Sequence, residues 1–106
     1  MEPSMTYLDE LSGGNEEFKK KIVKIILAEL PEEYTLYKHA IAGGNYFWAS
    51  EIVHRIIQKI AFFQLEESYK KVEKHEKYLR EGNLKYHPYF NEVVTKILNF
   101  LPKYSI

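Results

Sequence analysis

Three glycine–asparagine breaks constrain the fold of this chain more than any other feature of its sequence. They are Gly13-Gly14-Asn15, Gly43-Gly44-Asn45 and Gly82-Asn83. Glycine readily adopts the left-handed conformation that ends a helix, and an asparagine side chain can then cap the first amides of the next helix. Between the breaks, apolar residues recur every three to four positions, and no segment alternates as a strand does. The sequence therefore predicts an all-α protein.

The breaks and two prolines predict where the helices begin and end. Proline is favoured in the first turn of a helix, so Pro31 and Pro88 are each expected to start one. The predicted helices, with approximate ends, are 6–11, 16–30, 31–42, 45–63, 65–80 and 88–101. Because short links join these helices, we expect an antiparallel bundle. A chain of 106 residues suits one domain, spanning residues 1–106.

The composition favours a folded domain with one core, and its positive and negative charges cancel. Hydrophobic residues make up 45% of the sequence and aromatic residues 15%, which is enough to build a core. Fifteen basic and fifteen acidic residues give a net charge of zero, so no charge excess favours nucleic acid or a membrane as a partner. The absence of cysteine excludes disulfides, thiolate metal sites and cysteine nucleophiles. No signal-peptide pattern is present at the start, and we expect a cytoplasmic protein that needs no cofactor.

Motifs for common chemistries are missing. The patterns GxSxG, GxxxxGK and GxGxxG do not occur, which removes the usual signs of a hydrolase, a kinase or a dehydrogenase. The four histidines are not spaced as HxxxH or HExxH, so no metal site is expected. Three histidines have ordinary interpretations: His39 lies in solvent, His75 lies on an exposed charged face, and His87 lies where a helix begins.

His54 is different, because the helical pattern places it opposite the core. At about 100° per residue, His54 projects roughly 160° from Ile56, which belongs to the apolar face of its helix. An outward histidine on a rigid helix can attack a phosphoryl group presented by another protein and hold it as a phosphoramidate. The face around His54 also predicts a partner-binding surface, which includes an exposed isoleucine. Its members are Ser50, Ile57, Gln58 and Ala61.

Several short sequence motifs along the chain resemble those of the histidine-containing phosphotransfer (Hpt) domain family. They begin with LDELSGGNEEF (Leu8 to Phe18) and continue with Leu30-Pro31-Glu32, Ala40-Ile41 and the outward His54. Their order and spacing cover about Leu8 to Arg80. The segment from Val53-His54-Arg55-Ile56 through Leu65-Glu66-Glu67-Ser68-Tyr69 is most similar to small stand-alone Hpt-like proteins of some bacteria.

This resemblance implies a fold, a site and a class of partner. The fold would be an antiparallel four-helix bundle of Hpt type, with additional short N-terminal helices. His54 would accept a phosphoryl group and pass it on in a phosphorelay, as a carrier rather than a true enzyme. The partners would be a response-regulator receiver domain, a hybrid histidine kinase, or both, with magnesium bound by the receiver. The protein itself would be a monomer.

The chain departs from the family pattern beside the histidine. Family members usually carry lysine three residues after it, glycine at the fourth position, and often glycine at the tenth. Here these positions are Ile57, Gln58 and Gln64. Arg55 is therefore a candidate for contacting the phosphate, whereas Lys59 projects too far around the helix.

Two other functions stay open at this point. A degenerate Hpt-like adaptor would bind a receiver domain or a histidine kinase without phosphotransfer. An unrelated helical protein-interaction module would carry His54 incidentally.

Overall fold

Asparagine side chains cap two of the long helices, as the sequence predicts. Asn15 Oδ1 accepts a hydrogen bond from the amide of Phe18 (3.1 Å), and Asn45 Oδ1 accepts one from the amide of Trp48 (3.0 Å). The third break works differently, because Asn83 Oδ1 accepts from the amide of nearby Lys85 (2.9 Å) within the link before the last helix. Two of the three asparagines are thus helix caps, and the third stabilises a turn.

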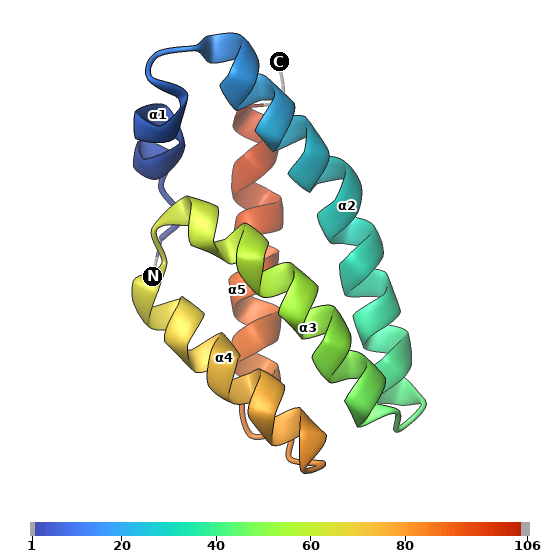
Figure 1. The fold of residues 1–106 in the computed structure, drawn as a ribbon. Coiled ribbons are helices and arrows are strands. Elements are labelled where there is room, and N and C mark those ends of the chain that lie inside the picture. The colour runs from blue at the N-terminus through green and yellow to red at the C-terminus, as the bar shows by residue number, and fades with distance from the viewer. Residues whose placement is uncertain (1, 105–106) are drawn as a thin grey trace.

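The protein is described by a computed structural model over residues 2–104, and within that range it is built from helices without strands (Figure 1). The prediction of an all-α protein is confirmed. Two 3₁₀ turns, η1 and η2, follow the third and fifth helices. The elements are α1 (Thr6–Ser12), α2 (Glu16–Ala42), α3 (Tyr46–Ile60), η1 (Ala61–Phe63), α4 (Glu66–Arg80), α5 (His87–Phe100) and η2 (Leu101–Tyr104).

Helix α2 corrects the prediction that Pro31 starts a new helix. The chain remains helical from Glu16 to Ala42, with Pro31 inside. An internal proline removes one backbone hydrogen bond and costs about 3 kcal/mol. Here the buried positions continue on both sides of Pro31, from Leu30 to Tyr37, and α2 packs along α3. This packing outweighs the lost bond, and Pro31 itself is exposed.

We expect Pro31→Ala to raise the free energy of unfolding by roughly 1–3 kcal/mol. The substitution restores the amide that can donate to the carbonyl of Leu27, and it removes no buried side chain. Urea denaturation of both proteins measures the difference. An unchanged or lower midpoint would show that the helix is already interrupted at this residue.

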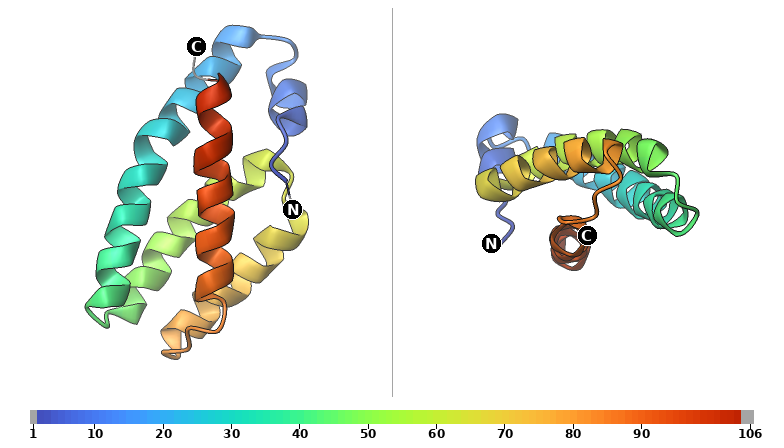
Figure 2. Two further views of the ribbon diagram at one scale, coloured as in Figure 1. Left: turned by 180° about the vertical axis from the view of Figure 1, so that it is seen from behind. Right: turned by 90° about the horizontal axis from the view of Figure 1, so that it is seen from below.

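Helix α3 is the central helix of the fold. It packs against α2 on one side and α4 on the other, and consecutive long helices run in opposite directions (Figure 1). Helix α5 lies behind the layer of these three helices (Figure 2). The buried residues form one hydrophobic cluster to which all five α-helices contribute. Within residues 2–104, no helix combines the length and the apolarity needed to cross a membrane.

Candidate functional site

His54 lies in the middle of α3 and points outward. Its side chain is 60% exposed, while its neighbours Val53 and Ile56 are fully buried. The predicted orientation of His54 is therefore confirmed. His39 is also exposed, as expected, and His87 is the first residue of α5.

A carboxylate from the next helix holds the imidazole of His54. Glu76, on α4, lies with Oε1 3.2 Å from His54 Nδ1, and the Glu76 side chain is only 15% exposed. A neutral histidine donates to a carboxylate through the ring nitrogen that carries the proton. This contact therefore places the proton on Nδ1 and leaves the lone pair on Nε2, which is the form a nucleophilic histidine requires.

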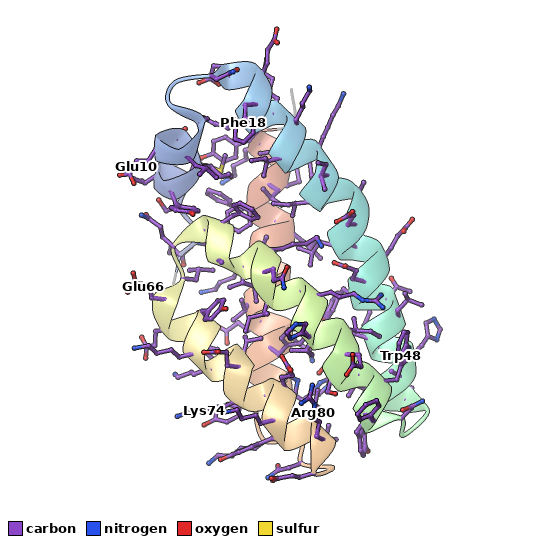
Figure 3. The ribbon with its side chains drawn as sticks, in the orientation of Figure 1. Glu10, Phe18, Trp48, Glu66, Lys74 and Arg80 are labelled. Atoms are coloured by element: carbon purple, nitrogen blue, oxygen red, sulfur yellow. The ribbon has the colours of Figure 1, made fainter. Side chains whose placement is uncertain are left out.

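Arg80 completes the cluster from one turn further along α4. Its Nη2 lies 3.1 Å from Glu76 Oε2, so the two oxygens of one carboxylate bind His54 and Arg80. Arg80 also reaches α3: Nε donates to Ser50 Oγ at 3.4 Å, and Nη2 lies 3.7 Å from Glu51 Oε1. The cluster thus spans the seam between α3 and α4, and Figure 3 labels Arg80 at this seam.

Two members of the predicted partner-binding surface are buried, so that part of the prediction is wrong. Ile57 is only 4% exposed, and Ser50 is fully buried with its hydroxyl donating to the carbonyl of Phe47 (2.6 Å). The helical pattern assumed one buried stripe, but α3 packs between two helices and buries a wider face. Gln58 and Ala61 are exposed, as predicted.

The two exposed members of that surface lie beside different grooves. Gln58 lines a groove between α3 and α2, and Ala61 lines a groove that α4 residues complete. They do not share one hollow next to His54. Whether either groove binds a partner stays a prediction.

The cations on α3 point toward α2 rather than toward the cluster. The guanidinium of Arg55 lies over the ring of Trp48, 5.5 Å from its centroid, and Lys59 pairs with Glu29 and Glu33 of α2, each at 3.0 Å. Figure 3 shows Trp48 on the α2 side of α3 and Arg80 on the α4 side. The predicted contact between Arg55 and a phosphate on His54 is therefore not supported by its position.

The interior contains a hydrogen-bonded chain that the sequence did not reveal. His75 was expected on an exposed face, but it is fully buried, and this expectation is wrong. Its Nε2 lies 2.8 Å from Tyr37 Oη, which lies 2.6 Å from His87 Nδ1. The chain continues through Asn91, whose Nδ2 lies 3.2 Å from His87 Nε2 and whose Oδ1 accepts from Tyr34 Oη (2.8 Å).

The direction of the hydrogen bonds follows from the amide of Asn91. Because Nδ2 can only donate, His87 Nε2 accepts, and His87 Nδ1 donates to Tyr37. Tyr37 then donates to His75 Nε2, so the proton of His75 resides on Nδ1. That buried nitrogen has no hydrogen-bond partner among residues 2–104.

Burial shifts the pKa values of this chain. Desolvation, together with the nearby His87, lowers the pKa of His75 to about 4, and desolvation also lowers the pKa of His87. Burial raises the pKa of the Tyr37 hydroxyl, with a smaller contribution from Tyr34. Both histidines are therefore neutral at pH 7.

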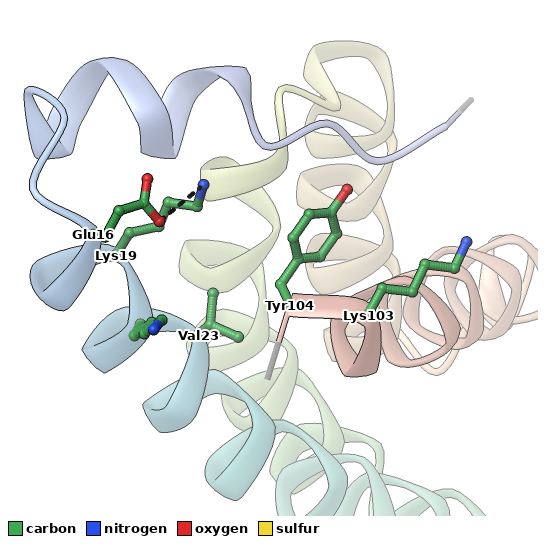
Figure 4. Close-up of a pocket in the computed structure, with 6 residues that line it drawn as sticks. Glu16, Lys19, Val23, Lys103 and Tyr104 are labelled. Carbon is green, nitrogen blue, oxygen red and sulfur yellow. Dashed lines mark ion pairs between the residues drawn. The ribbon is translucent and has the colours of Figure 1, made fainter. Parts of the chain in front are cut away.

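A further pocket lies where the start of α2 meets η2 (Figure 4). Its wall includes Lys19, Lys20 and Lys103, so it is rich in positive charge. Lys19 is already paired with Asp9 at 2.6 Å and lies 3.9 Å from Glu16. Among residues 2–104, no histidine lines this pocket, so the cluster at His54 is the stronger candidate for a site with an imidazole nucleophile.

Comparison with known proteins adds no family assignment. No family model, curated protein or solved structure matches the chain. Within residues 2–104, no group of three or more histidine, aspartate or glutamate side chains is placed to hold a metal ion. The function is therefore argued from the geometry of His54 and its partners.

Proposed function

We propose that this protein is a phosphorelay carrier of the Hpt type, in which His54 accepts a phosphoryl group from a receiver domain and returns it to another. The observation that carries this proposal is the exposed imidazole of His54, held at Nδ1 by Glu76 with the lone pair on Nε2. A histidine that only filled space would not need a partly buried carboxylate to orient its ring.

The proposed phosphoryl transfer needs no proton donor. The lone pair of His54 Nε2 attacks the phosphorus of a receiver's aspartyl phosphate, an N–P bond forms, and the P–O bond to the aspartate breaks. The aspartate leaves as a carboxylate. The ring keeps its Nδ1 proton and gains positive charge, which Glu76 offsets at 3.2 Å. Magnesium would be bound by the receiver, and the reverse reaction follows the same steps.

Two features of the fold support the Hpt resemblance. The four long helices α2 to α5 alternate in direction, as an antiparallel four-helix bundle requires (Figure 1). Gln64 has φ = 54°, a left-handed conformation that glycine adopts most easily, and it occupies the position where the family often has glycine.

The charges around His54 favour a second candidate, an Hpt-like adaptor that binds a receiver without transfer. Glu76 contacts the imidazole and Glu51 lies near Arg80, so the cluster contains two negative charges and one positive charge. A dianionic phosphoryl group would meet this excess of negative charge. The position that carries lysine in the family is the buried Ile57, so α3 supplies no cation there.

Measuring whether the protein takes up a labelled phosphoryl group separates the two candidate functions. The protein is mixed with a phosphorylated receiver domain and magnesium, and in parallel with phosphoramidate as a small phosphoryl donor. We expect an acid-labile, base-stable label on wild type and none on His54→Gln. His39→Gln is the matched control, because His39 is also exposed, and it should be labelled like wild type.

Two other outcomes of this experiment would change the proposal. Label that persists in His54→Gln would place the chemistry elsewhere and reject the proposal. Binding of a receiver by wild type without label from either donor would support the adaptor.

A further inference from the structure

The cluster at His54 leaves one question about the proposed transfer, namely which cation would hold the phosphoryl group. The guanidinium of Arg55 lies over the ring of Trp48 on α3, and Lys59 pairs with Glu29 and Glu33 of α2. Arg80 is the basic side chain that contacts the carboxylate of Glu76 and the turn of α3 that precedes His54.

We infer that Arg80 is the phosphate-binding residue of this site, supplied by α4 in place of a lysine on α3. The inference rests on the proposed function and deepens it. Ser50 lies one helical turn before His54 on the same side of α3, and Arg80 Nε donates to its hydroxyl at 3.4 Å. The guanidinium therefore contacts the helical turn before His54 and shares the carboxylate of Glu76 with the imidazole.

Arg80 has donors to spare for a phosphoryl group. A guanidinium carries five N–H groups in a planar fork that matches phosphate oxygens. Only the contact with Glu76 is short, at 3.1 Å, whereas those with Ser50 and Glu51 are 3.4 and 3.7 Å. The side chain is 47% exposed, so an incoming group can reach it.

Phosphorylation redistributes the contacts of this cluster. When Nε2 bonds to phosphorus, the ring gains positive charge and its Nδ1–H binds Glu76 more strongly. The phosphoryl group adds negative charge to a cluster in which Arg80 is the cation that contacts both Glu76 and α3. Glu76 then pairs mainly with the imidazole, and Arg80 turns its free N–H groups to the phosphoryl oxygens. The carboxylate thus keeps both partners in place before the reaction and releases one of them during it.

The test uses phosphoramidate as donor, so that docking to a receiver does not enter. We expect Arg80→Ala to slow labelling of His54 by about 10-fold or more, a factor that corresponds to about 1.4 kcal/mol. Arg80→Lys should recover part of the rate, because an ammonium keeps the charge but loses the fork. Arg55→Ala is the matched control: it removes one exposed positive charge from the α2 side of α3 and should react like wild type.

A second measurement separates phosphate binding from positioning of the ring. Inorganic phosphate is titrated into each protein while the ring protons of His54 are followed by NMR. Wild type should show a saturable shift that Arg80→Ala loses and Arg55→Ala keeps. Melting temperatures of the variants confirm that all of them are folded.

The outcomes distinguish this inference from the function on which it rests. If wild type is not labelled at all, the proposed transfer fails and this inference fails with it. If wild type and Arg80→Ala are labelled equally fast, His54 is a carrier but Arg80 does not bind the phosphoryl group. Equal losses in Arg80→Ala and Arg55→Ala would indicate a general effect of charge and also reject a specific role for Arg80.

Discussion

Ile57→Glu is expected to lower the free energy of unfolding by about 3–5 kcal/mol, as an unpaired buried charge does. Ile57 is 4% exposed and belongs to the hydrophobic cluster, although it lies only three residues from the exposed His54. The carboxylate would have to lose its water without gaining a cation. Since small domains are stable by about 5–15 kcal/mol, this loss is a large fraction of the total free energy of unfolding.

Gln58→Glu is the matched control for this change. It introduces the same charge at the next position of α3, where the side chain is exposed, and it should alter stability by less than about 0.5 kcal/mol. Chemical denaturation followed by circular dichroism measures both variants. Similar stabilities of the two variants would mean that α3 is rotated and that Ile57 faces solvent.

The helices were predictable because local interactions determine most of their ends. Asn15 and Asn45 cap α2 and α3 as expected, and the segments between the breaks are helical, as their periodicity predicts. The prediction at Pro31 is wrong because a sequence pattern contains only local terms, namely the preference of proline for a first turn and the hydrogen bond that it removes inside a helix. The opposing term, the packing of α2 along α3, depends on residues far apart in the chain.

The site was predictable only as far as one helix determines it. His54 opposes Ile56 on α3, so its exposure followed from the periodicity. Glu76 and Arg80 have the spacing of an i, i+4 ion pair, a signal that the sequence contains. Their contact with His54 depends on how α4 is rotated against α3, and no local pattern contains that information.

The sequence contains one signal for the burial of His75. Leu65, Tyr69, Val72 and Leu79 are apolar residues at helical spacing, and they leave one turn of α4 without an inward residue. His75 lies three residues after Val72 and four before Leu79, so it fills that gap. A histidine can occupy such a position when another polar group pairs with it, and here Tyr37, from α2, is the partner.

The buried His75 leads to the second large effect, a loss of stability in mild acid. The pKa of His75 is about 4 in the folded protein, against about 6.5 in an unfolded chain. Between these values the unfolded state binds more protons than the folded state, so the free energy of unfolding decreases as the pH falls. Stability is complete above pH 6.5 and decreases by on the order of 3 kcal/mol by pH 4, because a pKa change of one corresponds to about 1.4 kcal/mol. His87, with its lowered pKa, acts in the same direction.

His75→Gln isolates this effect from the general titration of carboxylates. The glutamine oxygen can still accept a hydrogen bond from the Tyr37 hydroxyl, but the side chain no longer binds a proton in this range. We expect the free energy of unfolding, measured in urea from pH 7.5 to 4, to depend less steeply on pH in the variant, by up to one proton. His39→Gln removes an exposed histidine and should leave the slope unchanged. Equal slopes for wild type and His75→Gln would mean that His75 titrates normally, and the buried chain from His75 to Tyr34 would then have to be open to water.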